Sequence, residues 1–134
     1  MLDVGCGSGI LSIIAAKLGA SDIQAIDIDP DSIAATLENG ERNKVAHSIS
    51  SSTKPLTHVD QTFDLVVANI LSHILLDLSV DLARCVDQGG QLLLSGILQE
   101  KAADIVFCFQ KHGLHLEKQI QDGQWVAQVW RRTS

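Results

Sequence analysis

Apolar segments of strand length alternate with segments of helix length along the chain, and this alternation limits the folds available to it. Short apolar runs predict strands, and most are followed by a longer segment whose apolar residues recur at helical spacing. The predicted strands are residues 2–4, 22–28, 45–50, 63–69 and 91–97, and the predicted helices are residues 9–20, 29–43, 72–86 and 99–113. Strands joined by helices of this length form a parallel sheet with helices on both faces.

The end of the chain departs from this alternation. Residues 114–121 and 124–132 are two further strand segments, and the pair Asp122-Gly123 between them is typical of a hairpin turn. The last strand should therefore lie antiparallel to its neighbour. The predicted fold is one α/β domain over residues 1–134, a Rossmann-like doubly wound sheet that is mostly parallel with a C-terminal antiparallel hairpin strand.

Capping and turn residues predict where these elements begin and end. Asp29 is expected to cap the second helix, with Pro30 in its first turn, and Ser72 is expected to cap the third helix. Residues 51–62 are polar and predict a loop. Residues 87–90, with the sequence DQGG, predict a break between the third helix and the strand that follows.

The charge and cysteine content exclude several classes of function. Ten Lys and Arg residues are scattered and outnumbered by sixteen Asp and Glu residues, giving a net charge of −6, so a nucleic-acid partner is not expected. No apolar run reaches the roughly 18–20 residues of a membrane span, and no metal-ligand spacing is present. Three cysteines in unrelated contexts predict reduced thiols and a cytoplasmic protein. The acidic surface either suits a basic protein partner or simply confers solubility.

Three glycines at alternate positions occupy the first predicted strand-to-helix turn. Gly5, Gly7 and Gly9 allow positive φ and let a ligand approach the backbone closely, next to a helix N-terminus that favours an anionic group. A dinucleotide site would need a Gly-x-Gly-x-x-Gly or Ala pattern, and Ile10 and Ser12 stand where its last residue would be. The spacing therefore indicates a different nucleoside ligand.

The observed pattern is Asp-x-Gly-x-Gly-x-Gly, and it resembles the first motif of methyltransferases that use S-adenosyl-L-methionine. The resemblance implies that the turn packs against the amino-acid end of this cofactor. Asp3 would then attract the cofactor's ammonium group, directly or through water. The alternative for Asp3 is a carboxylate that caps the loop.

Polar residues after the second and third predicted strands complete the expected cofactor site. Asp27 ends the second strand about twenty residues past the glycines, where a carboxylate can accept two hydrogen bonds from a ribose diol. Ile28, beside it, is counted with the cofactor contacts. Ser50 or Ser51 lies where this fold contacts the adenine edge, although a polar loop would contain serines in any case.

Asn69 ends the fourth predicted strand, which faces the methyl group of the cofactor in such methyltransferases. Methyl transfer requires a neutral amine whose lone pair faces the methyl carbon. An uncharged Asn oxygen can accept a hydrogen bond from that amine without favouring its protonated form. The candidate catalytic residue is therefore Asn69, and the alternative is an ordinary turn residue at a strand end.

A closer resemblance covers nearly the whole chain. The sequence is similar to the catalytic domain of the bacterial ribosomal protein L11 methyltransferase family in the segments LDVGCGSGILSIIAAKLGA, AIDIDPDSI, FDLVVANIL, GGQLLLSGIL and GQWVAQVWRR. The resemblance implies methyl transfer to lysine side-chain amines and the N-terminal amine of a basic ribosomal protein. It also implies that Ile70, Leu71, Ser95 and Gly96 border the amine pocket with Asn69.

The resemblance includes no counterpart of the family's N-terminal substrate-binding domain. At most four residues precede Gly5, so we expect an N-terminally truncated enzyme whose exposed sheet edge permits self-association. Two alternatives stay open. One is a methyltransferase for small-molecule amines, and the other is an inactive fragment that only binds the cofactor or a partner protein.

Overall fold

The computed structural model describes residues 1–133, which form two compact units. The first unit is Met1–Val59, and the second begins at Asp60. The boundary falls within the segment that the sequence predicts to be a loop.

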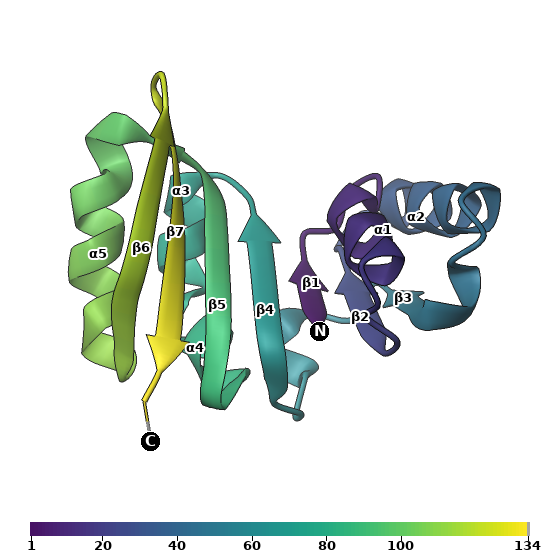
Figure 1. The fold of residues 1–134 in the computed structure, drawn as a ribbon, viewed down its shortest axis with the longest axis horizontal. Coiled ribbons are helices and arrows are strands. Elements are labelled where there is room, and N and C mark those ends of the chain that lie inside the picture. The colour runs from purple at the N-terminus through teal and green to yellow at the C-terminus, as the bar shows by residue number, and fades with distance from the viewer. Residues whose placement is uncertain (134) are drawn as a thin grey trace. The chain divides into compact units, whose positions relative to one another are not determined.

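The first unit is a parallel three-stranded sheet with two α-helices (Figure 1). The strand order is β3-β2-β1. In chain order the elements are β1 (Leu2–Val4), α1 (Ile10–Lys17), β2 (Ile23–Ile26), α2 (Pro30–Arg42), the 3₁₀ turn η1 (Ala46–Ser48), β3 (Ile49–Ser52) and the 3₁₀ turn η2 (Leu56–His58). The predicted alternation of strand and helix is confirmed in this unit.

Local signals account for the helix ends of the first unit. The Asp29 side chain accepts a hydrogen bond from the Asp31 N–H at 2.9 Å, and Pro30 is the first residue of α2, as predicted. Helix α1 follows Gly9, whose φ is +84°, and ends just before Gly19, whose φ is +109°. These two glycines, on either side of α1, adopt a backbone conformation that other residues avoid.

The second unit contains four strands in the order β4-β5-β7-β6. Its elements are β4 (Phe63–Asn69), α3 (Ser72–Asp77), α4 (Ser79–Arg84), β5 (Val86–Leu98), η3 (Gln99–Lys101), α5 (Ala102–Phe109), η4 (Gln110–His112), β6 (Leu114–Asp122) and β7 (Trp125–Arg132). Strands β4 and β5 are parallel, whereas β7 is antiparallel to both β5 and β6. The predicted hairpin, with its one reversed strand, is confirmed, but its turn is one residue later than predicted, at Gly123 and Gln124, because Asp122 ends β6 and pairs with Trp125.

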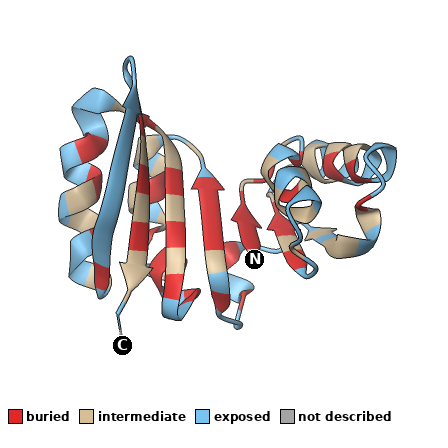
Figure 2. Ribbon diagram, in the orientation of Figure 1, coloured by how far each residue is buried: buried red, intermediate tan, exposed pale blue. Residues whose placement is uncertain are grey.

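The core of the second unit lies where β5 and β7 meet the helices α3, α4 and α5. Val126, Gln128 and Trp130 alternate along β7 and are buried, and the Trp130 ring lies 6.0 Å from that of Phe109 in α5. The buried Gln128 amide is satisfied, because Trp130 Nε1 donates to its Oε1 at 3.1 Å. Strand β6 is exposed along most of its length (Figure 2).

The predicted helix over residues 72–86 is wrong in two respects. It is divided into α3 and α4 at Leu78, and it begins at Ser72 itself with Leu71 in the capping position, without a side-chain cap. Apolar spacing predicts correctly that Leu75 and Leu82 are buried. Spacing alone does not reveal the turn between them, because the period on each side of Leu78 is that of a helix.

The predicted break at residues 87–90 is also wrong, since these residues belong to β5. A Cβ on Gly90 would lie 2.9 Å from the Asp87 oxygen and 3.1 Å from the Phe63 oxygen, so backbones approach closely here. The β4–β5 register shifts between Phe63 and Leu65. Gly90 therefore allows an irregularity within the strand. From the sequence alone, the same glycine indicated the end of an element.

The third strand lies later in the chain than residues 45–50. Residues Ala46–Ser48 form a 3₁₀ turn, and β3 spans Ile49–Ser52, so Ser50 and Ser51 lie within the strand and not after it. Each residue of β3 is half-buried or exposed, as its polar composition requires. A strand with so little apolar patterning gives a weak sequence signal.

Candidate functional site

The turn between β1 and α1 has the backbone geometry that its glycines predict. Gly5, Gly7 and Gly9 have φ values of +72°, +55° and +84°. A Cβ on Gly9 would lie 2.9 Å from Thr36 Cγ2, so Gly9 is needed for packing of the turn against α2. A Cβ on Gly7 would meet nothing within 4 Å. Gly7 is thus open to the approach of a ligand, whereas Gly9 is not.

Neighbouring elements hold this turn by hydrogen bonds to its backbone. The Gly5 and Cys6 N–H groups both donate to the Ile26 oxygen, at 2.9 and 3.0 Å. From α2, Thr36 Oγ1 donates to the Gly7 oxygen at 3.0 Å and Asn39 Nδ2 donates to the Ser8 oxygen at 2.9 Å. Sequence reasoning missed Thr36 and Asn39. Their spacing of three residues, which puts two polar side chains on one helix face, is the signal that could have found them.

Asp27 follows β2 and is oriented by two backbone donors. Its Oδ2 accepts the Gly7 N–H at 3.0 Å, and its Oδ1 accepts the Asp29 N–H at 3.0 Å. A carboxylate has about four acceptor positions, so each oxygen retains one for a ligand. The predicted cofactor residues Gly7 and Asp27 are thus in direct contact, and the carboxylate is fixed beside the open face of the turn.

Asp3 is buried within β1, with 1% of its surface exposed. Its Oδ2 accepts a hydrogen bond from the Ser12 hydroxyl at 2.7 Å, which joins β1 to α1. Burial raises the pKa of the Asp3 carboxyl, the Ser12 hydrogen bond opposes that rise, and the negative charge of Asp27 adds to it. Ser12 was not predicted as part of this site.

The other predicted cofactor residues of the first unit differ in exposure. Ile28 is 84% exposed, which is unusual for a large apolar side chain and leaves it available to a ligand. Ser50 is exposed on β3, and the Ser51 hydroxyl is buried without a hydrogen-bond partner. The structure therefore places Asp27 and Ile28 side by side at the end of β2, and Ser50 on the neighbouring strand.

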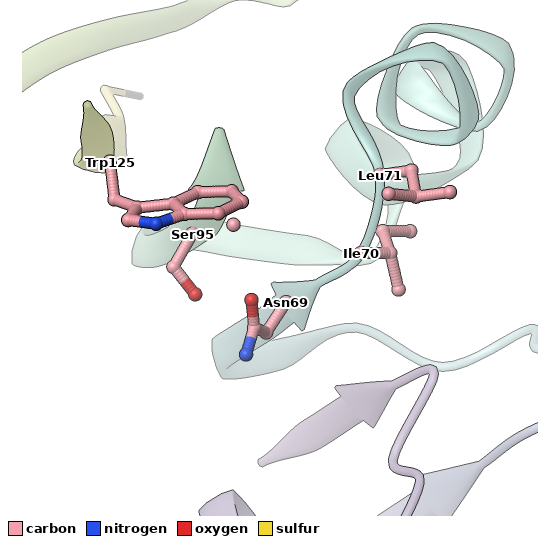
Figure 3. A pocket seen from close by; sticks show the side chains of 6 residues that line it. Asn69, Ile70, Leu71, Ser95 and Trp125 are labelled. Carbon is pink, nitrogen blue, oxygen red and sulfur yellow. The ribbon is translucent and has the colours of Figure 1, made fainter. Parts of the chain in front are cut away.

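Asn69 lies in the second unit, at the end of β4, and opens onto a pocket of about 560 Å³ (Figure 3). The lining residues are Asn69, Ile70, Leu71, Ser95, Gly96 and Trp125. The parallel pairing of β4 with β5 puts Asn69 opposite Ser95. The four residues that the family resemblance placed around Asn69 all line this pocket, and none of the six lining side chains is charged.

Trp125 was missed by sequence reasoning. It is 50% exposed, begins β7 just after the hairpin turn, and pairs with Leu98 of β5, which brings its ring to the pocket. A large aromatic residue beside a polar turn could have been noticed. Its proximity to Asn69 depends on the β5–β7 register, which the sequence does not give.

The Asn69 side chain is unpaired and directed into the pocket. Its oxygen is turned toward Ser95 and Trp125, and its nitrogen is turned away from them (Figure 3). Across residues 1–133, the carboxamide makes no hydrogen bond to another protein group. It is therefore free to bind a ligand.

Within the described part of the chain, no helix is long and apolar enough to cross a membrane. In residues 1–133 there is also no group of three or more His, Cys, Asp and Glu side chains placed to hold a metal ion.

Comparison with known proteins gives one consistent family. A family model described as ribosomal protein L11 methyltransferase (PrmA) matches residues 1–133. A ribosomal protein L11 methyltransferase from Geotalea daltonii is 46% identical over 125 residues, which are 93% of this chain and 40% of that protein. The chain thus spans about two fifths of the length of the curated relatives it matches, with 40% and 42% for two of them.

Solved structures have the same fold. The crystal structure of a ribosomal protein L11 methylase from Lactobacillus delbrueckii subsp. bulgaricus has a TM-score of 0.92 and 36% identity, covering 99% of this chain and 69% of that chain. Magnesium protoporphyrin IX methyltransferase from Synechocystis, solved with bound S-adenosylmethionine, has a TM-score of 0.82 at 20% identity, covering 98% and 69%. The second likeness concerns the fold alone. The predicted Rossmann-like α/β class is confirmed.

Proposed function

Because the chain belongs to the ribosomal protein L11 methyltransferase family, we propose that it is the catalytic domain of an S-adenosylmethionine-dependent N-methyltransferase. Its substrates would be lysine and N-terminal amines of a ribosomal protein. The observation that carries this proposal is the contact between Gly7 and Asp27, which presents a ligand with an open glycine backbone beside an oriented carboxylate.

The residues of the first unit fit the cofactor. Asp27 retains acceptor positions for the two ribose hydroxyls, and the exposed Ile28 offers an apolar surface to adenine, with Ser50 on the next strand. Gly5, Gly7 and Gly9 would pack against the amino-acid end, and the negative charge of Asp3 would attract the ammonium group. This cofactor supplies an electrophilic methyl carbon on a sulfonium.

The pocket of the second unit suits an amine. The Asn69 oxygen can accept one N–H and the Ile70 backbone oxygen a second, which leaves the nitrogen lone pair to face the methyl carbon. Because no lining side chain is charged, removal of the amine from water favours its neutral form, the only form with a lone pair. Trp125 forms an apolar wall of the pocket.

The transfer is a single displacement. S-adenosylmethionine held by Gly7 and Asp27 would supply the methyl group, with the electron pair of the broken C–S bond kept on sulfur. Asn69 and the Ile70 backbone oxygen would orient the neutral amine whose lone pair takes up the methyl group, and the methylated amine would release one proton to water. No residue needs to act as a strong base on an amine that is already neutral. Positioning by Asn69 would supply most of the acceleration, and well-oriented systems gain roughly 7–11 kcal/mol in this way.

The net charge of −6 supports a basic partner, which ribosomal proteins commonly are, and gives no support for direct nucleic-acid binding. Self-association through a sheet edge also stays a prediction, measurable by sedimentation.

Two alternative functions are each supported by one observation. A chain that spans 40% of a relative could bind the cofactor without turnover, and the pocket does not itself distinguish a lysine from a small amine.

Two measurements test the proposal. Calorimetry with S-adenosylmethionine and with S-adenosylhomocysteine should show one site, and transfer of labelled methyl groups should occur to recombinant ribosomal protein L11 and not to free small amines. Binding without transfer would support the binding module, and preferential transfer to small amines would support the second alternative. Absence of any binding would reject the cofactor site.

A further inference from the structure

Gly96 lies at an irregular point of β5. Its φ is +74°, and the pairing of β5 with β7 shifts register between Leu94 and Ile97. Bulges of this kind bend a strand and redirect the side chains near them. Gly96 follows Ser95, the residue paired with Asn69 across β4 and β5.

The space that a side chain of residue 96 would need is occupied by the Asn69 carboxamide. A Cβ on Gly96 would lie 2.5 Å from Asn69 Oδ1, which is far inside van der Waals contact, and 3.4 Å from the Ile70 backbone oxygen. The third nearest atom is Asn69 Cγ, at 3.7 Å. All three atoms belong to Asn69 and Ile70, at and just after the end of β4, so close packing of a helix is not the reason for a glycine here.

We propose that Gly96 is a positioning residue for Asn69, an inference that rests on the proposed role of Asn69 in binding the amine. The exposed carboxamide makes no hydrogen bond to another described protein group, so its orientation depends on the space that its neighbours leave. The missing Cβ at Gly96 creates the space in which Oδ1 lies, turned toward Ser95 and Trp125 (Figure 3). Any side chain at this position would rotate Oδ1 out of line with the amine N–H.

The chain offers a matched control in Gly89, which also lies in β5. Its φ is likewise +74°, but a Cβ there would meet nothing within 4 Å. Gly96→Ala and Gly89→Ala therefore impose the same backbone strain, and only the first places a methyl group against Asn69.

The first measurement compares the kinetics of methyl transfer to recombinant ribosomal protein L11. We expect Gly96→Ala to lower kcat by about tenfold or more while KM for S-adenosylmethionine changes by less than about twofold. Gly89→Ala should leave kcat within about twofold of the wild type. Equal losses of kcat in the two variants would overturn the proposal, because backbone strain would then explain both.

The second measurement needs no enzymatic activity. Gly96→Ala should lower the midpoint of thermal unfolding more than Gly89→Ala does, and in an Asn69→Ala background the two should lower it equally, because the clash is gone. If Gly96→Ala alone does not fold, the double variant should. An undiminished effect of Gly96→Ala in that background, or a double variant that also fails to fold, would overturn the proposal. An inactive wild type would reject the proposed function and leave this test intact.

Discussion

The two candidate binding regions differ in whether their polar groups have hydrogen-bond partners within the protein. In the glycine turn of the first unit, the Gly7 N–H, the Gly7 oxygen and the Asp27 carboxylate all have hydrogen-bond partners, and Asp3 is paired with Ser12. In the pocket of the second unit, Asn69 has no partner within the described chain and lies among uncharged side chains.

The difference follows from burial. A buried carboxylate such as Asp3 needs a donor, because leaving it unpaired costs about 1–3 kcal/mol or more. Asn69 is exposed, so water can form hydrogen bonds with its carboxamide until a ligand replaces the water. The first unit is thus organised before a ligand binds, and the second offers a hydrogen-bonding capacity that only a ligand uses. Four substitutions test this contrast.

The largest effect is expected from Asn69→Ala. Loss of the only uncommitted amide oxygen in the pocket should lower kcat by about 100-fold or more, while cofactor affinity stays within about twofold. Single-turnover methyl transfer and calorimetry measure the two quantities, in this chain and in a full-length family member. The control is Asn43→Ala at the exposed end of α2, where the amide that is lost donates to the Asn39 oxygen at 2.8 Å. Retained turnover would remove Asn69 from the mechanism.

Asp27→Asn should have the next largest effect, and on binding. The variant loses the charge and one of the two acceptor oxygens, which hold the Gly7 and Asp29 N–H groups and would meet the ribose, so cofactor affinity should fall by about 10- to 100-fold. At saturating cofactor, kcat should change little. The control is Asp29→Asn, which keeps a good helix cap. Equal affinities for these two variants would show that the Gly7–Asp27 contact has no role in binding.

The parts of this molecule that sequence predicted are those governed by local chemistry. Positive φ at Gly5, Gly7 and Gly9, the Asp29 cap and the existence of the β6–β7 hairpin each depend on a few adjacent residues. Asn69 was found because a polar residue ends an apolar strand, and the structure places it at a pocket.

The parts that sequence missed depend on partners distant in the chain. Trp125 reaches the pocket through the β5–β7 register, and Thr36 reaches Gly7 through the packing of α2 on the turn. The glycines of residues 87–90 wrongly predicted a break between a helix and a strand, although these residues belong to β5. Glycine is favoured both in turns and at strand irregularities, so its presence does not distinguish the two. The role of Gly96 becomes visible only when the neighbours of its missing side chain are known.

Asp3→Asn is expected to change the pH dependence of stability. Burial raises the folded-state pKa of Asp3 above its ordinary value of 3.8, so its contribution to stability is complete below that value and is lost as pH rises through the folded pKa. The uncharged variant should therefore gain free energy of unfolding relative to the wild type across that window, then keep a constant difference at higher pH. Urea unfolding between pH 3 and pH 8 measures this. Asp122→Asn, at the exposed end of β6, is the control, and curves for Asp3→Asn that run parallel to the wild type would contradict the burial argument.

The smallest effect is expected from Ile28→Ser. Because the side chain is 84% exposed, its removal should leave the free energy of unfolding unchanged. If adenine packs against it, binding covers part of this apolar surface, and the loss should weaken cofactor affinity by about three- to tenfold. Leu18→Ser is a close match, since Leu18 is 83% exposed and lies at the end of α1, away from Asp27 in the chain. Calorimetry should separate the two variants, with Leu18→Ser binding as the wild type does. A similar affinity for both would mean that the first unit binds the nucleoside through its hydrogen-bonded groups alone, which would make the contrast with the Asn69 pocket sharper still.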